Sequence, residues 1–299
     1  MSTQTNKITP FYFDSQELQQ LAEKHRPEFL SADPFPHVVI DNFLPDDILD
    51  QIVEEFPGPE DDAWTLWGPG DIKHTHNRNI EKLGTSNEQA FGPLTRHIMA
   101  QLNSYTFVQF IQELTNSRYI MVDPSYNGCG LHSTGRGGKL MVHVDGNRHP
   151  NSFSGLMHQR LNLILYINKD WKEEYGGHLE LWNRDASECV KKVSPVFNRC
   201  LIFETGSYSY HGHPSPMTCP EGRRRNSLAV YYYQLQRDAD VDYGGMQYAV
   251  KWAGTQEGDS GLRSKDWLWI LKVEGTILVK RLLPPILLDM IRNIRNKKT

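Results

Sequence analysis

The stretch Arg160-Leu161-Asn162-Leu163-Ile164-Leu165-Tyr166-Ile167-Asn168 does most to decide the fold of this chain. Residues 161–167 form a short apolar run that ends at a turn-forming asparagine, which predicts a buried β-strand. Similar short runs occur at residues 119–122, 140–143, 177–181, 199–203 and 227–235, and glycine, asparagine or proline separates most of them. Many short strands between turns predict a β-sandwich or barrel, with a two-sheet jelly roll as the natural candidate.

The first part of the chain is predicted to contain more helix than the strand-rich part that follows. A capping-box pattern at Asp14-Ser15-Gln16-Glu17 predicts one short helix, residues 35–41 predict a strand, and the acids after Pro45 predict a helix start. Residues 57–87 are expected to be mostly loop, and residues 88–103 and 105–115 are expected to be helical. The predicted fold class is therefore α+β, mainly β: a jelly roll (double-stranded β-helix) with N-terminal supporting helices and a C-terminal helical extension.

Three segments are expected. Residues 1–34 would be a polar N-terminal extension, residues 35–240 the jelly-roll domain with its helical support, and residues 241–299 a C-terminal extension with an apolar and basic tail. Between residues 280 and 299, six basic residues stand against one acid. After Pro284-Pro285, residues 286–295 can form a short helix with an apolar and a basic face, which is typical of interfacial segments. Residues 267–299 are therefore predicted either to contact a membrane surface or a partner, or to pack on their own jelly roll or a dimer mate.

Composition excludes several classes of protein. The 299 residues are 38% hydrophobic and 23% charged, as in soluble globular proteins. A net charge of −4 argues against a nucleic-acid partner. No apolar run reaches the ~18 residues of a spanning helix, and the polar first ten residues lack a signal peptide's apolar stretch. The four cysteines form no CxxC pair, so reduced thiols and a cytoplasmic location, free or peripheral to a membrane, are expected.

The residues that could carry chemistry begin with His143-Val144-Asp145, at the end of a predicted strand, followed much later by His211. Two histidines and one carboxylate on one face of Fe(II) leave positions open for a cosubstrate and dioxygen. A strand and its exit turn can direct His143 and Asp145 to one point. His213 is the alternative distal ligand.

A second group lies on the last predicted strand. In a strand that begins near Arg225, the side chains of Arg225 and Ser227 share one face. An arginine beside a hydroxyl is a suitable clamp for a dicarboxylate, because the guanidinium can bind a carboxylate through two charge-assisted hydrogen bonds. Arg223 and Arg224 are interpreted as a solvated turn. His178-Leu179-Glu180 also pairs a histidine with a carboxylate, but it is interpreted as sheet packing.

Six ordered blocks of sequence resemble the 2-oxoglutarate- and Fe(II)-dependent dioxygenases, in particular the prolyl 4-hydroxylase-like branch. The matching blocks are residues 143–145, 160–171, 176–181, 197–203, 211–214 and 225–229, and the resemblance spans residues 35–235. It implies that His143, Asp145 and His211 are the catalytic iron ligands. It also implies that Arg225 and Tyr166 bind the far carboxylate of 2-oxoglutarate, next to Ser227. His132 lies near the place of a pocket tyrosine in relatives and is interpreted as a loop histidine.

The resemblance implies an oxidoreductase, a dioxygenase that hydroxylates a C–H bond and releases succinate and CO₂. Its cofactors would be Fe(II), 2-oxoglutarate as cosubstrate, O₂, and ascorbate as a reductant. The substrate is left open between a small molecule, a peptide and a glycan. The alternative of another class is a non-redox jelly roll, either a cupin-type isomerase or a sugar-binding module, which would not need Arg225 in a cosubstrate pocket.

Overall fold

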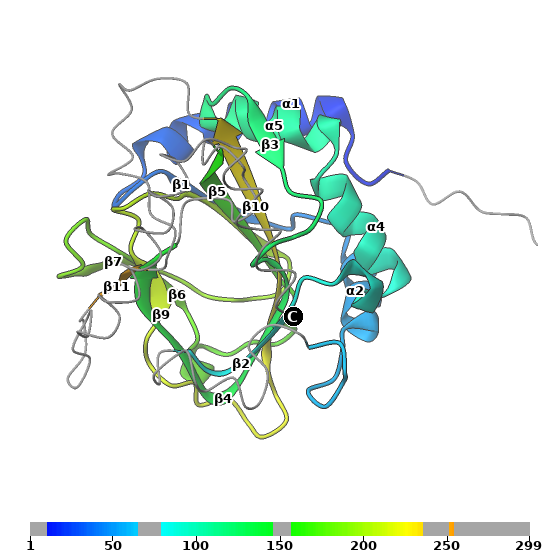
Figure 1. Ribbon diagram of the computed structural model, residues 1–299, viewed down its shortest axis with the longest axis vertical. Helices are drawn as coiled ribbons and strands as arrows, with labels where there is room; N and C mark the ends of the chain where they lie inside the picture. Colours follow the sequence, from blue (N-terminus) through cyan, green and yellow to red (C-terminus); the bar gives the residue numbers. More distant parts are fainter. Residues whose placement is uncertain (1–10, 65–78, 146–156, 236–250, 254–299) are drawn as a thin grey trace, which may run out of the picture.

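The chain is a jelly roll whose strands form one nearly closed, barrel-like sheet (Figure 1). The computed structural model describes residues 11–64, 79–145, 157–235 and 251–253. Strand neighbours follow the order β1-β8-β5-β10-β4-β9-β6-β7, with β2 and β11 also paired to β4 and β3 paired to β10. The strands are β1 (His37–Asp41), β2 (Asn79–Thr85), β3 (Ile120–Val122), β4 (Gly130–Val144), β5 (Met157–Tyr166), β6 (Leu179–Trp182), β7 (Cys189–Val193), β8 (Arg199–Glu204), β9 (His211–His213), β10 (Arg225–Leu235) and β11 (Lys251–Trp252). The predicted mainly β jelly roll is confirmed.

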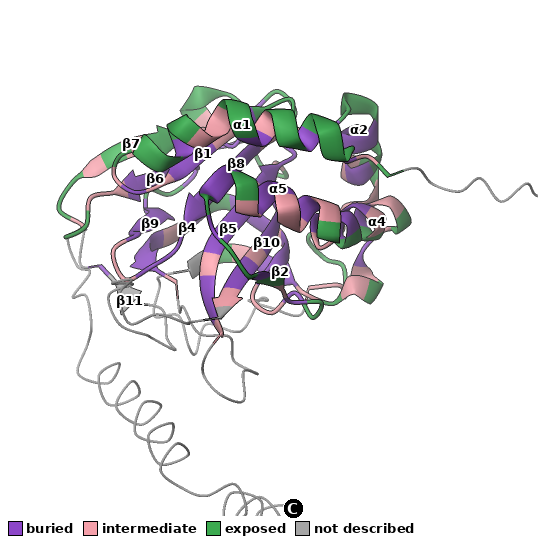
Figure 2. Cartoon of the chain, turned by 90° about the horizontal axis from the view of Figure 1, so that it is seen from above, coloured by how far each residue is buried: buried purple, intermediate pink, exposed green. Residues whose placement is uncertain are grey.

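Helices cover one face of this sheet, and their outer sides are exposed while their inner sides are buried (Figure 2). The described helices are α1 (Ser15–Ser31), α2 (Asp46–Glu55), α4 (Pro93–Leu102) and α5 (Tyr105–Thr115), with single 3₁₀ turns at Glu88–Ala90 and Glu173–Tyr175. The predicted N-terminal helical support is therefore present.

Helix α1 is longer than the short helix that the capping pattern suggested. The Asp14 carboxylate caps it by accepting hydrogen bonds from the backbone N–H groups of Gln16 and Glu17. Its buried residues Leu18 and Phe29 belong to the main hydrophobic core. The helix thus packs with the jelly roll, while a segment boundary at residue 34 stays a prediction.

Alternation along β5 separates the core from the barrel interior. Leu161, Leu163 and Leu165 are fully buried in the core beneath the helices. Tyr166 belongs to a second apolar cluster, together with Phe203 of β8, on the opposite face. Successive strand side chains point to opposite faces, so the run that predicted the strand also builds both sides of its sheet.

Several strands were not expected from the sequence. The prediction of loop over residues 57–87 is wrong for 79–85, because β2 pairs with β4 there. The strand predicted at residues 140–143 is the end of the much longer β4, and β7 and β9 had no prediction. The tail at 267–299 and the helical extension lie outside the described residues. Within the described ranges, no helix has the length and apolar character to cross a membrane.

Candidate active site

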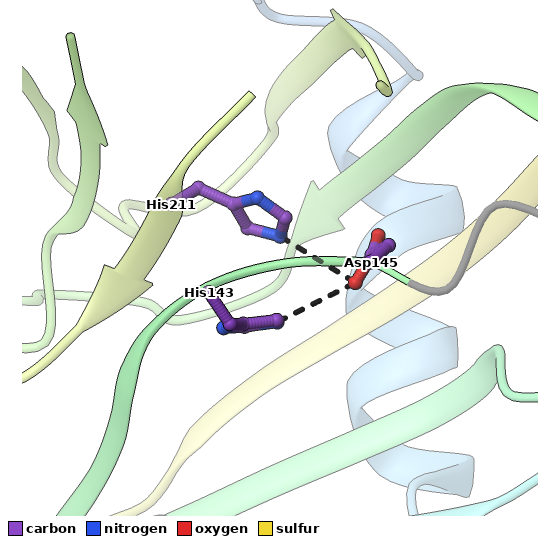
Figure 3. A group of neighbouring side chains, drawn as sticks. All are labelled: His143, Asp145 and His211. Atoms are coloured by element: carbon purple, nitrogen blue, oxygen red, sulfur yellow. Dashed lines mark ion pairs between the residues drawn. The ribbon is translucent and has the colours of Figure 1, made fainter. Parts of the chain in front are cut away.

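His143, Asp145 and His211 converge at the point where β4 ends beside β9 (Figure 3). The β4–β9 pairing sets His143 directly opposite His211, and Asp145 follows β4. Asp145 Oδ1 lies 3.4 Å from His143 Nε2 and 3.8 Å from His211 Nε2. One ligand atom from each residue lies within 4.8 Å of the others. The antiparallel pairing thus brings together residues that are far apart in the chain.

Backbone carbonyls orient both imidazoles. Nδ1 of His143 is 2.8 Å from the Met141 carbonyl oxygen, and Nδ1 of His211 is 2.9 Å from that of Ser209. A carbonyl oxygen can only accept, so each Nδ1 carries the proton and each Nε2 presents its lone pair. Such outer hydrogen bonds are what fix the tautomer of metal-binding histidines.

Two amides on β5 hold the remaining oxygen of Asp145. Oδ2 accepts hydrogen bonds from Gln159 Nε2 at 3.1 Å and from Asn162 Nδ2 at 3.5 Å. Oδ1 therefore stays turned toward the histidines. This support was not predicted from the sequence, although Asn162 stands out as a polar residue between Leu161 and Leu163 on the face opposite to the core.

The protonation states of the group suit a divalent cation. Burial lowers the pKa of His211 to about 4, so its ring is neutral at pH 7. Burial alone would raise the pKa of Asp145, but the neighbouring His211 and His143 and the hydrogen bond from Gln159 hold it well below its ordinary value. The residues thus supply an ionised carboxylate and imidazole nitrogens, a donor set that fits Fe(II).

Arg225 and Tyr166 form a buried polar pair elsewhere on the inner face. Arg225 Nε donates to the Gly177 carbonyl at 2.7 Å, and Nη2 donates to Tyr166 Oη at 3.1 Å. Ser227 lies opposite Tyr166 in the β5–β10 register. The structure therefore groups all three residues that the sequence analysis assigned to cosubstrate binding.

The glycine at position 177 allows the Arg225 side chain to come close to the backbone there. Its φ is +72°, and a Cβ there would lie 2.7 Å from Met217 Sδ and 3.1 Å from Arg225 Cδ. A side chain at this position would force Met217 to move and would crowd the Arg225 side chain.

The alternative ligands lie elsewhere. His213 is buried opposite Leu140 and is not a member of the three-residue group. His178 Nε2 lies 2.8 Å from Glu173, and Glu180 pairs with Lys192 at 3.0 Å, so the His178–Glu180 pair does not converge. The interpretation of His132 as a loop residue is wrong: it lies on β4, opposite Ser227.

Comparison with known proteins finds a matching family model and a curated relative. Residues 129–233 match the sequence profile of the 2OG-Fe(II) oxygenase superfamily. The curated prolyl 3-hydroxylase OGFOD1 of Mus musculus is 24% identical over 220 residues, which cover 70% of this chain and 34% of that protein. The chain thus spans about a third of the length of this relative.

Two solved structures share the fold. A prolyl hydroxylase of Trichoplax adhaerens, in complex with a peptide fragment of the hypoxia inducible factor oxygen degradation domain, aligns with a TM-score of 0.52 and 16% identity, over 76% of this chain and 94% of that one. A prolyl 4-hydroxylase of Phytophthora capsici aligns with a TM-score of 0.50 and 20% identity, over 90% and 77% of the two chains.

The fold and the site define a jelly-roll protein with a two-histidine, one-carboxylate group that could hold a metal ion. Residues 129–233 are thus similar to the 2OG-Fe(II) oxygenase superfamily, and the chain resembles two prolyl hydroxylases in fold.

Proposed function

We propose that this protein is a 2-oxoglutarate- and Fe(II)-dependent dioxygenase that hydroxylates a C–H bond of its substrate. The observation that carries the proposal is the convergence of His143, Asp145 and His211 in the barrel that also holds Arg225. Phe203 connects the two parts, because its ring centroid lies 4.8 Å from that of His211 and it packs in the same interior cluster as Tyr166. These contacts support the proposal of a metal site and an anion site in one interior.

In this proposal His143, Asp145 and His211 hold the iron, and Arg225 binds the far carboxylate of 2-oxoglutarate with Tyr166 and Ser227. Burial raises the pKa of Tyr166, which keeps its hydroxyl protonated. Its oxygen accepts from Arg225, so its proton is available for a carboxylate. Bound Fe(II), 2-oxoglutarate and O₂ supply the oxidising chemistry, with succinate and CO₂ as by-products.

The test is succinate release from 2-oxoglutarate by the full chain with Fe(II) and O₂, with Asp145→Ala as the inactive control. Succinate that depends on Fe(II) and on Asp145 supports the proposal. No succinate, even with ascorbate and a broad substrate panel, would favour the non-redox isomerase or sugar-binding module. Ascorbate is proposed as a reductant that sustains turnover, and omitting it should shorten the time course.

A peptidyl prolyl substrate is the first to test, since the relatives named above are prolyl hydroxylases. Small-molecule and glycan substrates form the remainder of the panel. Mass spectrometry of each product should show the addition of one oxygen atom. A cytoplasmic location is also proposed, on the basis of the unpaired cysteine pattern.

For residues 267–299 we propose a peripheral contact with an anionic membrane surface, supported by the net positive charge of residues 280–299 beside their leucines and isoleucines. The competing interpretation is packing on the jelly roll or on a dimer mate. Full-length protein should float with anionic liposomes at low salt, whereas a chain that ends near residue 265 should not. Full-length protein that stays unbound would exclude the membrane contact.

A further inference from the structure

Lys82 on β2 faces the barrel interior in the same row as Arg225. Thr134 of β4 lies opposite Arg225 in the β10–β4 pairing and opposite Lys82 in the β2–β4 pairing. Residues directly opposite each other in antiparallel strands project their side chains from the same face. Because Arg225 is on the inner face, Lys82 and Thr134 are there as well.

The neighbouring row has the same orientation. Gly84 and Ser227 both lie opposite His132, and Ser227 in turn lies opposite Tyr166. The β2–β4 register shifts between residues 80 and 82, and Glu81 has a φ of +53°. This bulge aligns Lys82 with the row of Arg225.

The charges in the interior agree with this placement. Burial, together with the charge of Arg225, lowers the pKa of Lys82 to about 8, while the charge of Asp145 acts in the opposite direction. Burial likewise lowers the pKa of His132, with contributions from Lys82 and Arg225. Two cationic side chains therefore interact electrostatically in the same interior as Asp145, whose charge the metal would use. Such a pair of cations is suited to an anionic ligand.

We propose that Lys82 binds the distal carboxylate of 2-oxoglutarate together with Arg225. The inference rests on the proposed function and adds a second cation to its cosubstrate site. Lys82 is assigned to the distal end because it shares its row with Arg225, whereas His143 lies near the other end of β4. A lysine contributes a compact charge with rotatable donors, which complements the fixed planar guanidinium.

The experiment is calorimetric binding to the full chain loaded with Zn(II), which cannot turn over. Two oxo acids are compared: 2-oxoglutarate, and 2-oxopentanoate, which has the same carbon chain without the distal carboxylate. In Lys82→Met, 2-oxoglutarate should bind about 10- to 100-fold more weakly, as expected for loss of a charged hydrogen bond, while 2-oxopentanoate binding is unchanged. Lys82→Arg should retain most of the affinity. Lys172→Met, at a lysine side chain with 61% exposure, should match the wild type.

Equal weakening of both oxo acids, or no weakening of either, would overturn the assignment of Lys82. Lys82→Gln provides a second charge-removing variant, and thermal unfolding midpoints show whether each variant is folded. Wild-type protein that binds no 2-oxoglutarate would instead contradict the proposed function. The two failures are therefore distinguishable.

Discussion

At the scale of single residues, each member of the proposed iron site is held by a second contact. Backbone carbonyls fix the two imidazoles, and Gln159 and Asn162 fix the carboxylate. Side chains held in this way by protein contacts would need little reorganisation to bind a metal.

Replacing His143, Asp145 or His211 with alanine should abolish turnover and sharply weaken Fe(II) binding, because two protein ligands remain where three are needed. Metal content after anaerobic reconstitution and succinate release measure the two effects. His178→Ala is the matched control, since His178 pairs with Glu173 away from the group. An active His211→Ala beside an inactive His213→Ala would move the distal ligand to His213.

Arg225→Ala should raise the KM for 2-oxoglutarate far more than it disturbs iron binding. The lost pair should cost on the order of 2–4 kcal/mol, because the carboxylate is left without its charged partner in a buried site. Steady-state kinetics and Fe(II) titration separate the effects, with Arg223→Ala as the control. An unchanged KM in Arg225→Ala would transfer the role to Arg223 or Arg224.

At the scale of elements, β4 organises the site, because it pairs with β2, β9, β10 and β11. The strand carries His132 in one part and His143 near its end. The local pattern His143-Val144-Asp145 and the alternation of Arg225 and Ser227 are readable from sequence, because neighbours on one strand determine them. The inward placement of Lys82 could not be predicted in this way. It depends on the pairing of β2 with β4, and β2 lies in a segment rich in loop-forming residues.

A side chain of α2 caps the N-terminus of α4 and so connects two of the helices that support the sheet. Glu55, the last residue of α2, accepts hydrogen bonds from the backbone N–H groups of Leu94 and Thr95 and from the Thr95 hydroxyl, at 2.8 to 2.9 Å. A carboxylate at the N-terminus of α4 also interacts favourably with the helix dipole.

Glu55→Ala should therefore lower the free energy of unfolding by about 1–2 kcal/mol. Urea denaturation measures the change, and Glu54→Ala, one residue earlier and exposed, should have little effect. Equal losses in both variants would show that the cap does not stabilise the contact between α2 and α4.

At the scale of the whole molecule, the sheet encloses histidines that folding keeps neutral. Burial lowers the pKa of His158 to about 4, with a further contribution from the charge of Arg160, and burial also lowers the pKa of His132 and of His37. The ordinary value for a histidine is 6.5. Burial therefore disfavours protonation of these three histidines in the folded protein.

The stability of the metal-free protein should fall as the pH is lowered from about 6.5 toward 4. In this range the unfolded chain takes up a proton at His158, whereas the folded chain does so only near pH 4, so protonation favours the unfolded state. Thermal unfolding at stepped pH values measures the slope, and His158→Gln should make it shallower. A slope that the substitution leaves unchanged would assign the pH dependence to other groups.

The proposed function requires one barrel interior to bind the metal and the oxo acid together. Its most direct test is anomalous diffraction from crystals of the full chain grown with Mn(II), a redox-stable substitute for Fe(II), and 2-oxoglutarate. We expect a single strong peak between His143, Asp145 and His211, with the oxo acid extending from it toward Arg225. A metal peak at His213, or 2-oxoglutarate bound away from Arg225, would contradict it.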